Sequence, residues 1–234
     1  MRPIRGWSAT LTEAGLLDGP VVLRPMGISA ARACRAVRAA NDSWLLPWEA
    51  SDPDGPPPAG QHAGPPVKSL ARSLAARFMR LVEPCAAAFY SRLGATLGIA
   101  ASWGIWYDGR FAGQVNVFRI AWGPLRSAEL GYWVDQRLAG RGIAPTALAM
   151  AADHCFGVMR LHRLEACIAP ENTASRRAVE KLGFRDEGLR VGQVHVNGAW
   201  RDHLGYAITA GETPGGLLPR WRERRHLATV ILTA

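Results

Sequence analysis

Between residues 100 and 210, short apolar runs of strand length alternate with longer runs of helical spacing. Residues 100–107 and 111–121 predict two strands, and Asp108-Gly109 between them is a strong hairpin signal. Three further strands are predicted at residues 127–134, at 161–168 and from Phe184 onward, and residues 191–196 and 200–209 predict a closing hairpin at Asn197-Gly198.

Two helices fit between these strands. After residue 142, apolar residues recur at near-helical spacing, and Pro145 falls in the first turn, where its missing N–H costs nothing. The second helix is predicted to start at Asn172, a good N-cap, and to end at Gly183.

The N-terminal part of the chain is less regular. Residues 21–26 predict a strand, residues 29–40 a helix with Ser29 as its N-cap, and residues 41–49 a turn. We therefore expect a single domain over residues 1–211, with a Pro/Gly-rich insertion at residues 51–67. Within residues 68–93 we expect two helices broken at Pro84. After the domain, residues 212–234 are expected to form a moderately disordered basic tail or partner-contact segment.

The most informative motif is Arg137-x-x-Gly140-x-Gly142, which lies between a predicted strand and a predicted helix. Glycines at such a junction let backbone N–H groups approach a ligand closely, and a helix N-terminus favours anions. The spacing differs from that of dinucleotide-binding folds and of P-loops. The motif predicts a cradle for a diphosphate group.

The order of these elements and several short motifs resemble the GNAT superfamily of N-acetyltransferases, and within it the RimJ/RimL branch that acetylates ribosomal-protein N-termini. The resemblance is dense from about residue 103 to residue 208 and thin before it. The matching motifs are Leu23-Arg-Pro25, Trp48-Glu49, Glu129-Leu-Gly-Tyr-Trp-Val134, the glycine motif, Leu161-His-Arg-Leu-Glu-Ala166, Pro170-Glu-Asn-Thr-Ala-Ser175, Glu180-Lys-Leu-Gly-Phe-Arg185, Glu187-Gly188 and Asn197-Gly-Ala-Trp-Arg-Asp-His203.

This resemblance implies an α+β GNAT fold, with a mixed and mostly antiparallel sheet of about seven strands and helices on both faces. The sheet is expected to splay between its fourth and fifth strands, at residues 129–134 and 161–168, and to admit acetyl-CoA there. The implied acetyl-CoA-binding residues are Trp133, Val134, Arg137, Gly140, Arg141, Gly142, Ile143, Ala144, Asn172 and Ser175.

Acetyl transfer needs a neutral amine and a stabilised leaving thiolate. Glu129 is the best candidate for a base, because it starts the strand that leads into the glycine motif; the alternative is an ordinary exposed glutamate. By resemblance, Ser175 protonates or hydrogen-bonds the thiolate. Trp48 and Glu49 are expected to bind the acceptor amine.

The amino-acid composition bears on the partners and the location of the protein. The chain has 28 Lys and Arg against 19 Asp and Glu, a net charge of +9, which favours anionic partners such as coenzyme A or ribosomal RNA but is equally compatible with a solvated surface. The four cysteines form no regular framework, and with no secretory signal or membrane span we expect a cytoplasmic protein, a monomer or homodimer, without a metal.

Three functions stay open from the sequence. The first is acetylation of a protein N-terminus, with ribosomal-protein alanine as the specific expectation. The second is acetylation of a small amine, such as a polyamine, a drug or an amino acid. The third is a coenzyme A-binding regulatory module without turnover, against which the intact Glu129, Asn172 and Ser175 argue.

Overall fold

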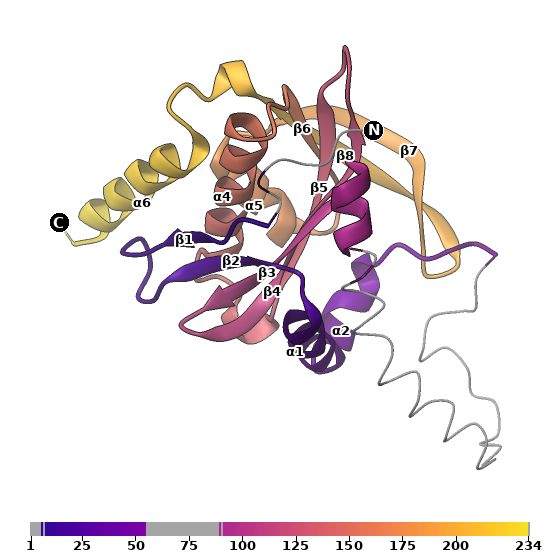
Figure 1. Ribbon diagram of the computed structural model, residues 1–234, viewed down its shortest axis with the longest axis horizontal. Helices are drawn as coiled ribbons and strands as arrows, with labels where there is room; N and C mark the ends of the chain where they lie inside the picture. Colours follow the sequence, from indigo (N-terminus) through magenta and orange to yellow (C-terminus); the bar gives the residue numbers. More distant parts are fainter. Residues whose placement is uncertain (1–5, 7, 55–88, 90, 234) are drawn as a thin grey trace.

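The computed structural model describes residues 6, 8–54, 89 and 91–233, and its centre is one eight-stranded sheet (Figure 1). The strand order is β1-β2-β3-β4-β5-β6-β8-β7, and all neighbours are antiparallel except β5 and β6, which are parallel. The strands are β1 (Leu11–Glu13), β2 (Val21–Pro25), β3 (Ala101–Tyr107), β4 (Arg110–Ala121), β5 (Ser127–Val134), β6 (Arg163–Ile168), β7 (Arg185–Val196) and β8 (Ala199–Thr209).

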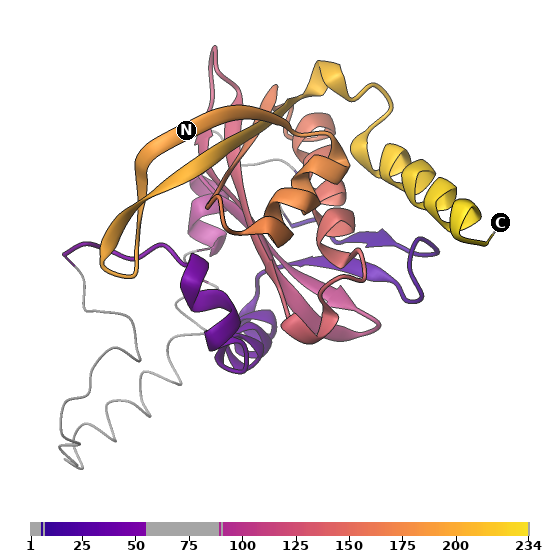
Figure 2. The ribbon, with the colours of Figure 1, turned by 180° about the vertical axis from the view of Figure 1, so that it is seen from behind.

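Helices cover both faces of the sheet, as Figures 1 and 2 show from opposite sides. One face carries α1 and α2; the other carries α4 and α5, with α6 against α4. The bounds are α1 (Ile28–Ala39), α2 (Asp42–Leu45), η1 (Leu46–Trp48), η2 (Gln136–Leu138), α4 (Ile143–Gly157), α5 (Thr173–Leu182), η3 (Ala210–Glu212) and α6 (Leu217–Thr233), and residues 91–97 are also helical.

The main core lies between the sheet and α4. This helix is apolar almost all round, and its buried residues pack against strands on one side and against α6 on the other. A smaller cluster built from Met26, Ala30 and Ala31 holds α1 on the opposite face. Burial of apolar surface on both faces stabilises the layered α+β arrangement that the sequence predicts.

The sheet splays where expected. β5 and β6 pair only at their first residues, and the last pair joins Glu129 to Glu165. Beyond this pair, residues 130–134 still bond to β4, while β6 bonds to β8. The two strands therefore form a V whose vertex is at Glu129. The predicted splay is confirmed, in a sheet that contains eight strands rather than about seven.

Three expectations for local structure were wrong. Gly27 rather than Ser29 occupies the N-cap of α1, and the predicted turn at residues 41–49 is built from α2 and η1. The expected disordered tail contains α6. The predicted helices broken at Pro84 and most of the insertion at residues 51–67 lie outside the described residues.

The C-terminal segment is helical because apolar residues recur at helical spacing within its basic sequence. Leu217 and Trp221, one helical turn apart, are both buried in the main core. The Asp153 carboxylate in α4 accepts hydrogen bonds from the backbone N–H groups of Leu217 (2.6 Å) and Leu218 (3.0 Å). This satisfies two of the free N–H groups that every helix N-terminus has.

Candidate active site

The glycine motif forms a tight loop between β5 and α4. Gly140 has φ +80° and Gly142, the N-cap of α4, has φ +87°, a left-handed conformation that side chains disfavour. A Cβ atom on Gly142 would collide with the Arg225 guanidinium of α6, whereas one on Gly140 would meet nothing. Both glycines are therefore required by backbone conformation, and Gly142 also by close packing.

The loop is anchored by two residues that the sequence analysis did not single out. Asp135, almost fully buried, accepts hydrogen bonds from the backbone N–H of Arg137 (3.1 Å) and from its guanidinium (2.5 Å). These bonds hold the pKa of Asp135 below its usual value. Asn41 accepts a bond from the Gln136 N–H at 2.8 Å. The signal that could have found Asp135 is its spacing, two residues before Arg137, which is typical of an Asx turn.

The Arg137 side chain is consequently engaged inside the loop. We expected it to add positive charge beside a diphosphate, but its guanidinium turns back onto Asp135, three-quarters exposed to solvent. Its main contribution in this structure is to fix the loop. Backbone N–H groups of the loop and of the first turn of α4, at Ile143 and Ala144, are the donors available to an anion there.

Across the V, the start of α5 carries the other predicted contacts. The Asn172 side chain caps the helix by accepting the Ser175 N–H at 3.1 Å, as predicted. The buried Tyr132 hydroxyl, whose pKa is raised by burial, donates to the Ser175 carbonyl at 3.0 Å. The backbone of Ser175 is thus held from both sides, and no hydrogen bond to its hydroxyl is recorded among the described residues.

The upper part of β5, residues 130–134, offers backbone groups that suit a chain of amides. Trp133 and Val134 pair with Gln114 and Gly113 of β4 and with no residue of β6. The buried Trp133 Nε1 has no hydrogen-bond partner among the described residues. Buried donors are usually paired in folded proteins, so this one is available to a ligand or a water molecule. An extended amide chain in the V fits this edge.

Glu129 lies at the vertex of the V. Its neighbours Ala128 and Leu130 point into the main core, so the Glu129 side chain lies on the opposite face, the one that carries α1. The carboxylate is 18% exposed and accepts two hydrogen bonds from Arg119, at 3.0 and 3.2 Å. Arg119 therefore holds the Glu129 carboxylate in place at the vertex of the V.

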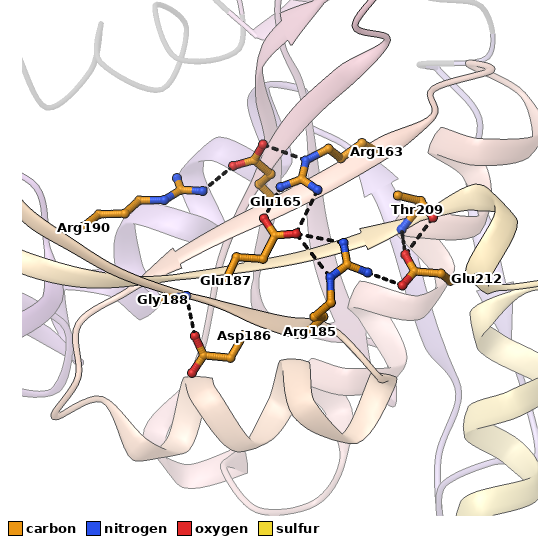
Figure 3. Close-up of polar contacts among 9 residues, drawn as sticks. All are labelled: Arg163, Glu165, Arg185, Asp186, Glu187, Gly188, Arg190, Thr209 and Glu212. Atoms are coloured by element: carbon orange, nitrogen blue, oxygen red, sulfur yellow. Dashed lines mark hydrogen bonds and ion pairs between the residues drawn. The ribbon is translucent and has the colours of Figure 1, made fainter.

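Next to Glu129, an arginine–carboxylate network ties β6, β7 and β8 together (Figure 3). Glu165 accepts bonds from Arg163 (2.9 Å) and Arg190 (2.6 Å). Glu187 pairs with Arg163 and Arg185, and these bonds lower its pKa to about 2. Unlike Glu129, both carboxylates have two arginine partners, so we assign them a structural role.

On the acceptor side, the Trp48-Glu49 motif is brought to β5 by α1. Glu49 forms an ion pair with Arg38, whose guanidinium lies 5.9 Å from the centre of the Trp133 ring. Trp48 is 38% exposed. The motif and the upper part of β5 therefore border one region, while binding of an acceptor amine by Trp48 and Glu49 stays a prediction.

The β7–β8 hairpin closes this region from the other side, which the sequence analysis missed. The Ser51 N–H donates to the His195 carbonyl at 2.8 Å, and the Ser51 hydroxyl lies 3.0 Å from Nδ1 of His195. The Asn197 side chain donates to the Leu46 carbonyl at 3.1 Å. The contact partner of His195 is 144 residues away, a separation over which sequence patterns carry no signal.

The described residues contain no group of three or more His, Cys, Asp or Glu side chains placed to hold a metal ion. Of the helices in the described part of the chain, none is both long enough and apolar enough to cross a bilayer.

Comparisons with known proteins agree with this geometry. The family model for the acetyltransferase (GNAT) domain matches residues 61–185, more than half of the chain. The structure of Mycobacterium smegmatis RimJ in complex with CoA-disulfide has a TM-score of 0.76 and 36% sequence identity, over 98% of this chain and 97% of that one.

Relatives similar in sequence include the following two. YjcK of Bacillus subtilis, named a probable N-acetyltransferase, is 41% identical over 101 residues, which are 43% of this chain and 56% of YjcK. The ribosomal protein uS5-alanine N-acetyltransferase of Escherichia coli is 32% identical over 104 residues, or 44% of this chain and 54% of the relative. The chain spans little more than half the length of these two relatives. From the family match and the similarity to RimJ along the whole chain, we conclude that this protein belongs to the GNAT acetyltransferase family.

Proposed function

We propose that this chain is an acetyl-CoA-dependent N-acetyltransferase that modifies the N-terminal α-amine of a protein, with a ribosomal protein that begins with alanine as the specific substrate. The observation that carries the proposal is the V at Glu129, bordered by the glycine loop on one side and by Glu49 and Arg38 on the other. The similarity to RimJ supports the choice of acceptor.

The residues present fit the cosubstrate. Left-handed glycines leave the loop backbone open to a diphosphate, and the unpaired edge of β5 with its orphaned Trp133 Nε1 suits the amides of a pantetheine arm. Bound acetyl-CoA supplies an activated acetyl group as a thioester. Glu129 then takes the proton that the amine loses, directly or through a water molecule, and the Ser175 hydroxyl hydrogen-bonds the departing sulfur.

The free-energy cost of deprotonating the acceptor favours an α-amine over a lysine side chain. An α-amino group has a pKa of about 7.7–8.0 and is partly neutral near pH 7.5, whereas a lysine with a pKa near 10.4 costs roughly 4 kcal/mol to deprotonate there. Glu129 is the carboxylate at the vertex, and Arg119 holds it in place. An acceptor that is already partly neutral places the smallest demand on it.

The test is a turnover assay with acetyl-CoA, read by thiol release, on peptides that begin with alanine or serine, on polyamines and on aminoglycosides. We expect acetylation of the peptides on residue one, located by mass spectrometry, with internal lysines spared. The matched control is the same peptide with a formyl group on its N-terminus, which should not react. Turnover of a polyamine or aminoglycoside with no peptide modified would contradict the proposed acceptor, and binding of coenzyme A without turnover of any amine would favour a regulatory module.

A cytoplasmic location and contact with ribosomal components belong to the same proposal. The net charge of +9 favours anionic partners, so we expect the rate with a ribosomal substrate to fall as the salt concentration rises.

A further inference from the structure

We propose that α6, which lies beyond the residues matched by the family model, positions the diphosphate loop through Trp221 and Arg225. The inference rests on the proposed function, because it concerns the binding of coenzyme A at that loop. It assigns a task to the basic C-terminal segment, which the family motifs leave unexplained.

Two hydrogen-bond routes run from α6 to consecutive carbonyl groups of the loop. Nη1 of Arg225 donates to the Arg141 carbonyl at 3.2 Å. The Trp221 indole N–H donates to the Thr146 hydroxyl at 2.9 Å, and that hydroxyl donates to the Gly142 carbonyl, also at 2.9 Å. Thr146 is fully buried, so water does not compete for this second route.

Because the peptide group is planar, a contact that holds a carbonyl also fixes the direction of the N–H group of the next residue. In a planar trans peptide the carbonyl and the N–H of the following residue point in opposite directions. The Arg141 carbonyl accepts from Arg225, so the Gly142 N–H points away from that guanidinium. The Gly142 carbonyl accepts the Thr146 N–H of α4 at 3.1 Å and also the Thr146 hydroxyl that Trp221 supports, and these two bonds together direct the Ile143 N–H. Both donors are thus oriented before any anion arrives.

The surroundings of Arg225 favour this positioning role over direct contact with phosphate. Arg225 lines a cavity of about 200 Å³ together with Asp18, Gly140 and Arg141. The Arg141 carbonyl already engages the Arg225 guanidinium, and the acidic Asp18 offsets the charge of one of the two arginines that line the cavity. Arg225 also lies 5.8 Å from the Trp221 ring, an arrangement that holds the guanidinium against the helix surface.

Arg225→Ala and Arg224→Ala form a matched pair for the test. The two arginines are adjacent and lose the same charge, but Arg224 donates to the Lys181 carbonyl of α5, away from the loop. We expect Arg225→Ala to weaken the binding of coenzyme A about tenfold, as measured by calorimetry, because one charge-assisted hydrogen bond is lost. Arg224→Ala should stay within about twofold of the unmodified protein, since exposed charges contribute little.

A second measurement needs no ligand. By NMR of the free protein, Arg225→Ala should shift the amide signals of Gly142 and Ile143 and speed their hydrogen exchange, while Arg224→Ala leaves them unchanged. Equal loss of affinity in both variants, or weaker binding with unchanged amides in Arg225→Ala, would overturn the positioning role. Trp221→Phe, which keeps the ring but removes the donor, should reproduce the amide shifts in a folded protein.

The two proposals fail in different ways. If the unmodified protein does not bind coenzyme A, the proposed function fails, while the amide measurement still tests how α6 acts on the loop. If the unmodified protein binds coenzyme A and Arg225→Ala matches it in affinity and in amide signals, only the role of α6 is wrong.

Discussion

The two sides of the V are built in different ways. The cofactor side consists of β5, the glycine loop and the start of α4, which follow one another within about 20 residues, and its geometry comes mainly from backbone conformation. The acceptor side joins α1, residues 48–51 and the β7–β8 hairpin through side-chain contacts between distant segments. The geometry of the cofactor side therefore depends mainly on local backbone conformation, supported by distant contacts from Asn41 and α6, whereas the acceptor side depends throughout on contacts between distant segments.

The largest expected effect comes from breaking the cofactor side. Gly142→Val should weaken coenzyme A binding by roughly 100-fold or more, because a left-handed non-glycine residue costs about 1–3 kcal/mol and a β-branched one more. The new side chain also meets the Arg225 guanidinium, so the Arg225 side chain must move away from the loop. Calorimetry on the folded variant measures the loss.

The comparison of Gly142→Ala with Gly140→Ala sharpens this prediction. Both residues have positive φ, but an added methyl group meets a neighbour only at Gly142. We expect the greater loss of affinity at Gly142. Equal losses would mean that backbone strain alone, and not packing against α6, limits the loop.

Glu129→Gln tests the vertex where the two sides meet. Removal of a general base typically lowers turnover about 10²–10⁴-fold, and we expect coenzyme A affinity to change little. The assay belongs at pH 6 as well as pH 7, because an amine that is already neutral hides the loss of a base. Glu165→Gln, the partner of Glu129 in the parallel pair, is the matched control. A loss below threefold for Glu129→Gln at both pH values would show that Glu129 is structural.

A smaller and more selective effect is expected on the acceptor side. Glu49→Gln should raise the KM for the acceptor by about tenfold, because it removes a charged partner for the amine and frees Arg38. The affinity for coenzyme A should not change. The matched control is Asp52→Asn at an exposed neighbouring carboxylate that bonds only the Asp54 N–H among the described residues. A change in coenzyme A affinity instead of KM would place Glu49 on the other side of the V.

The smallest effect concerns stability outside the site. His154 is buried in an edge-to-face contact with Trp103, 5.5 Å between ring centres, and burial lowers its pKa. The unfolded chain then binds more protons than the folded one as the pH falls below about 6.5, so stability should decrease toward pH 5, by no more than about 1.4 kcal/mol per pH unit. Thermal unfolding should show a flatter pH dependence in His154→Phe, and equal slopes would contradict the prediction.

The sequence predicted the fold from the middle of the chain onward. Hairpin signals at Asp108-Gly109 and Asn197-Gly198 lie where the structure turns, and Asn172 and Gly183 bound α5 as expected. These signals depend only on neighbouring residues, so they can be recognised from the sequence alone. The same logic located the glycine loop, because positive φ at a strand–helix junction demands glycine.

The remaining features depend on contacts that no local pattern encodes. Helix α6 lies beyond the motifs of the family resemblance, and its order comes from Trp221 and Leu217 packing on α4. Asp135 has the spacing of an Asx turn to Arg137, but its burial depends on tertiary packing. Whether Glu129 and Ser175 act in catalysis stays a prediction, since the structure places them at the V without a substrate.

Asn41 gives the two sides a mechanical link. Its amide N–H donates to the Val37 carbonyl in α1 at 2.8 Å, while its oxygen accepts the Gln136 N–H of the diphosphate loop at 2.8 Å. One buried side chain thus belongs to the framework of both sites. Linkage is reciprocal: if an acceptor that presses on α1 tightens the hold on coenzyme A by some factor, coenzyme A tightens the hold on the acceptor by the same factor. We therefore expect the coupling between the affinities for the two substrates to depend on Asn41, away from the reacting atoms.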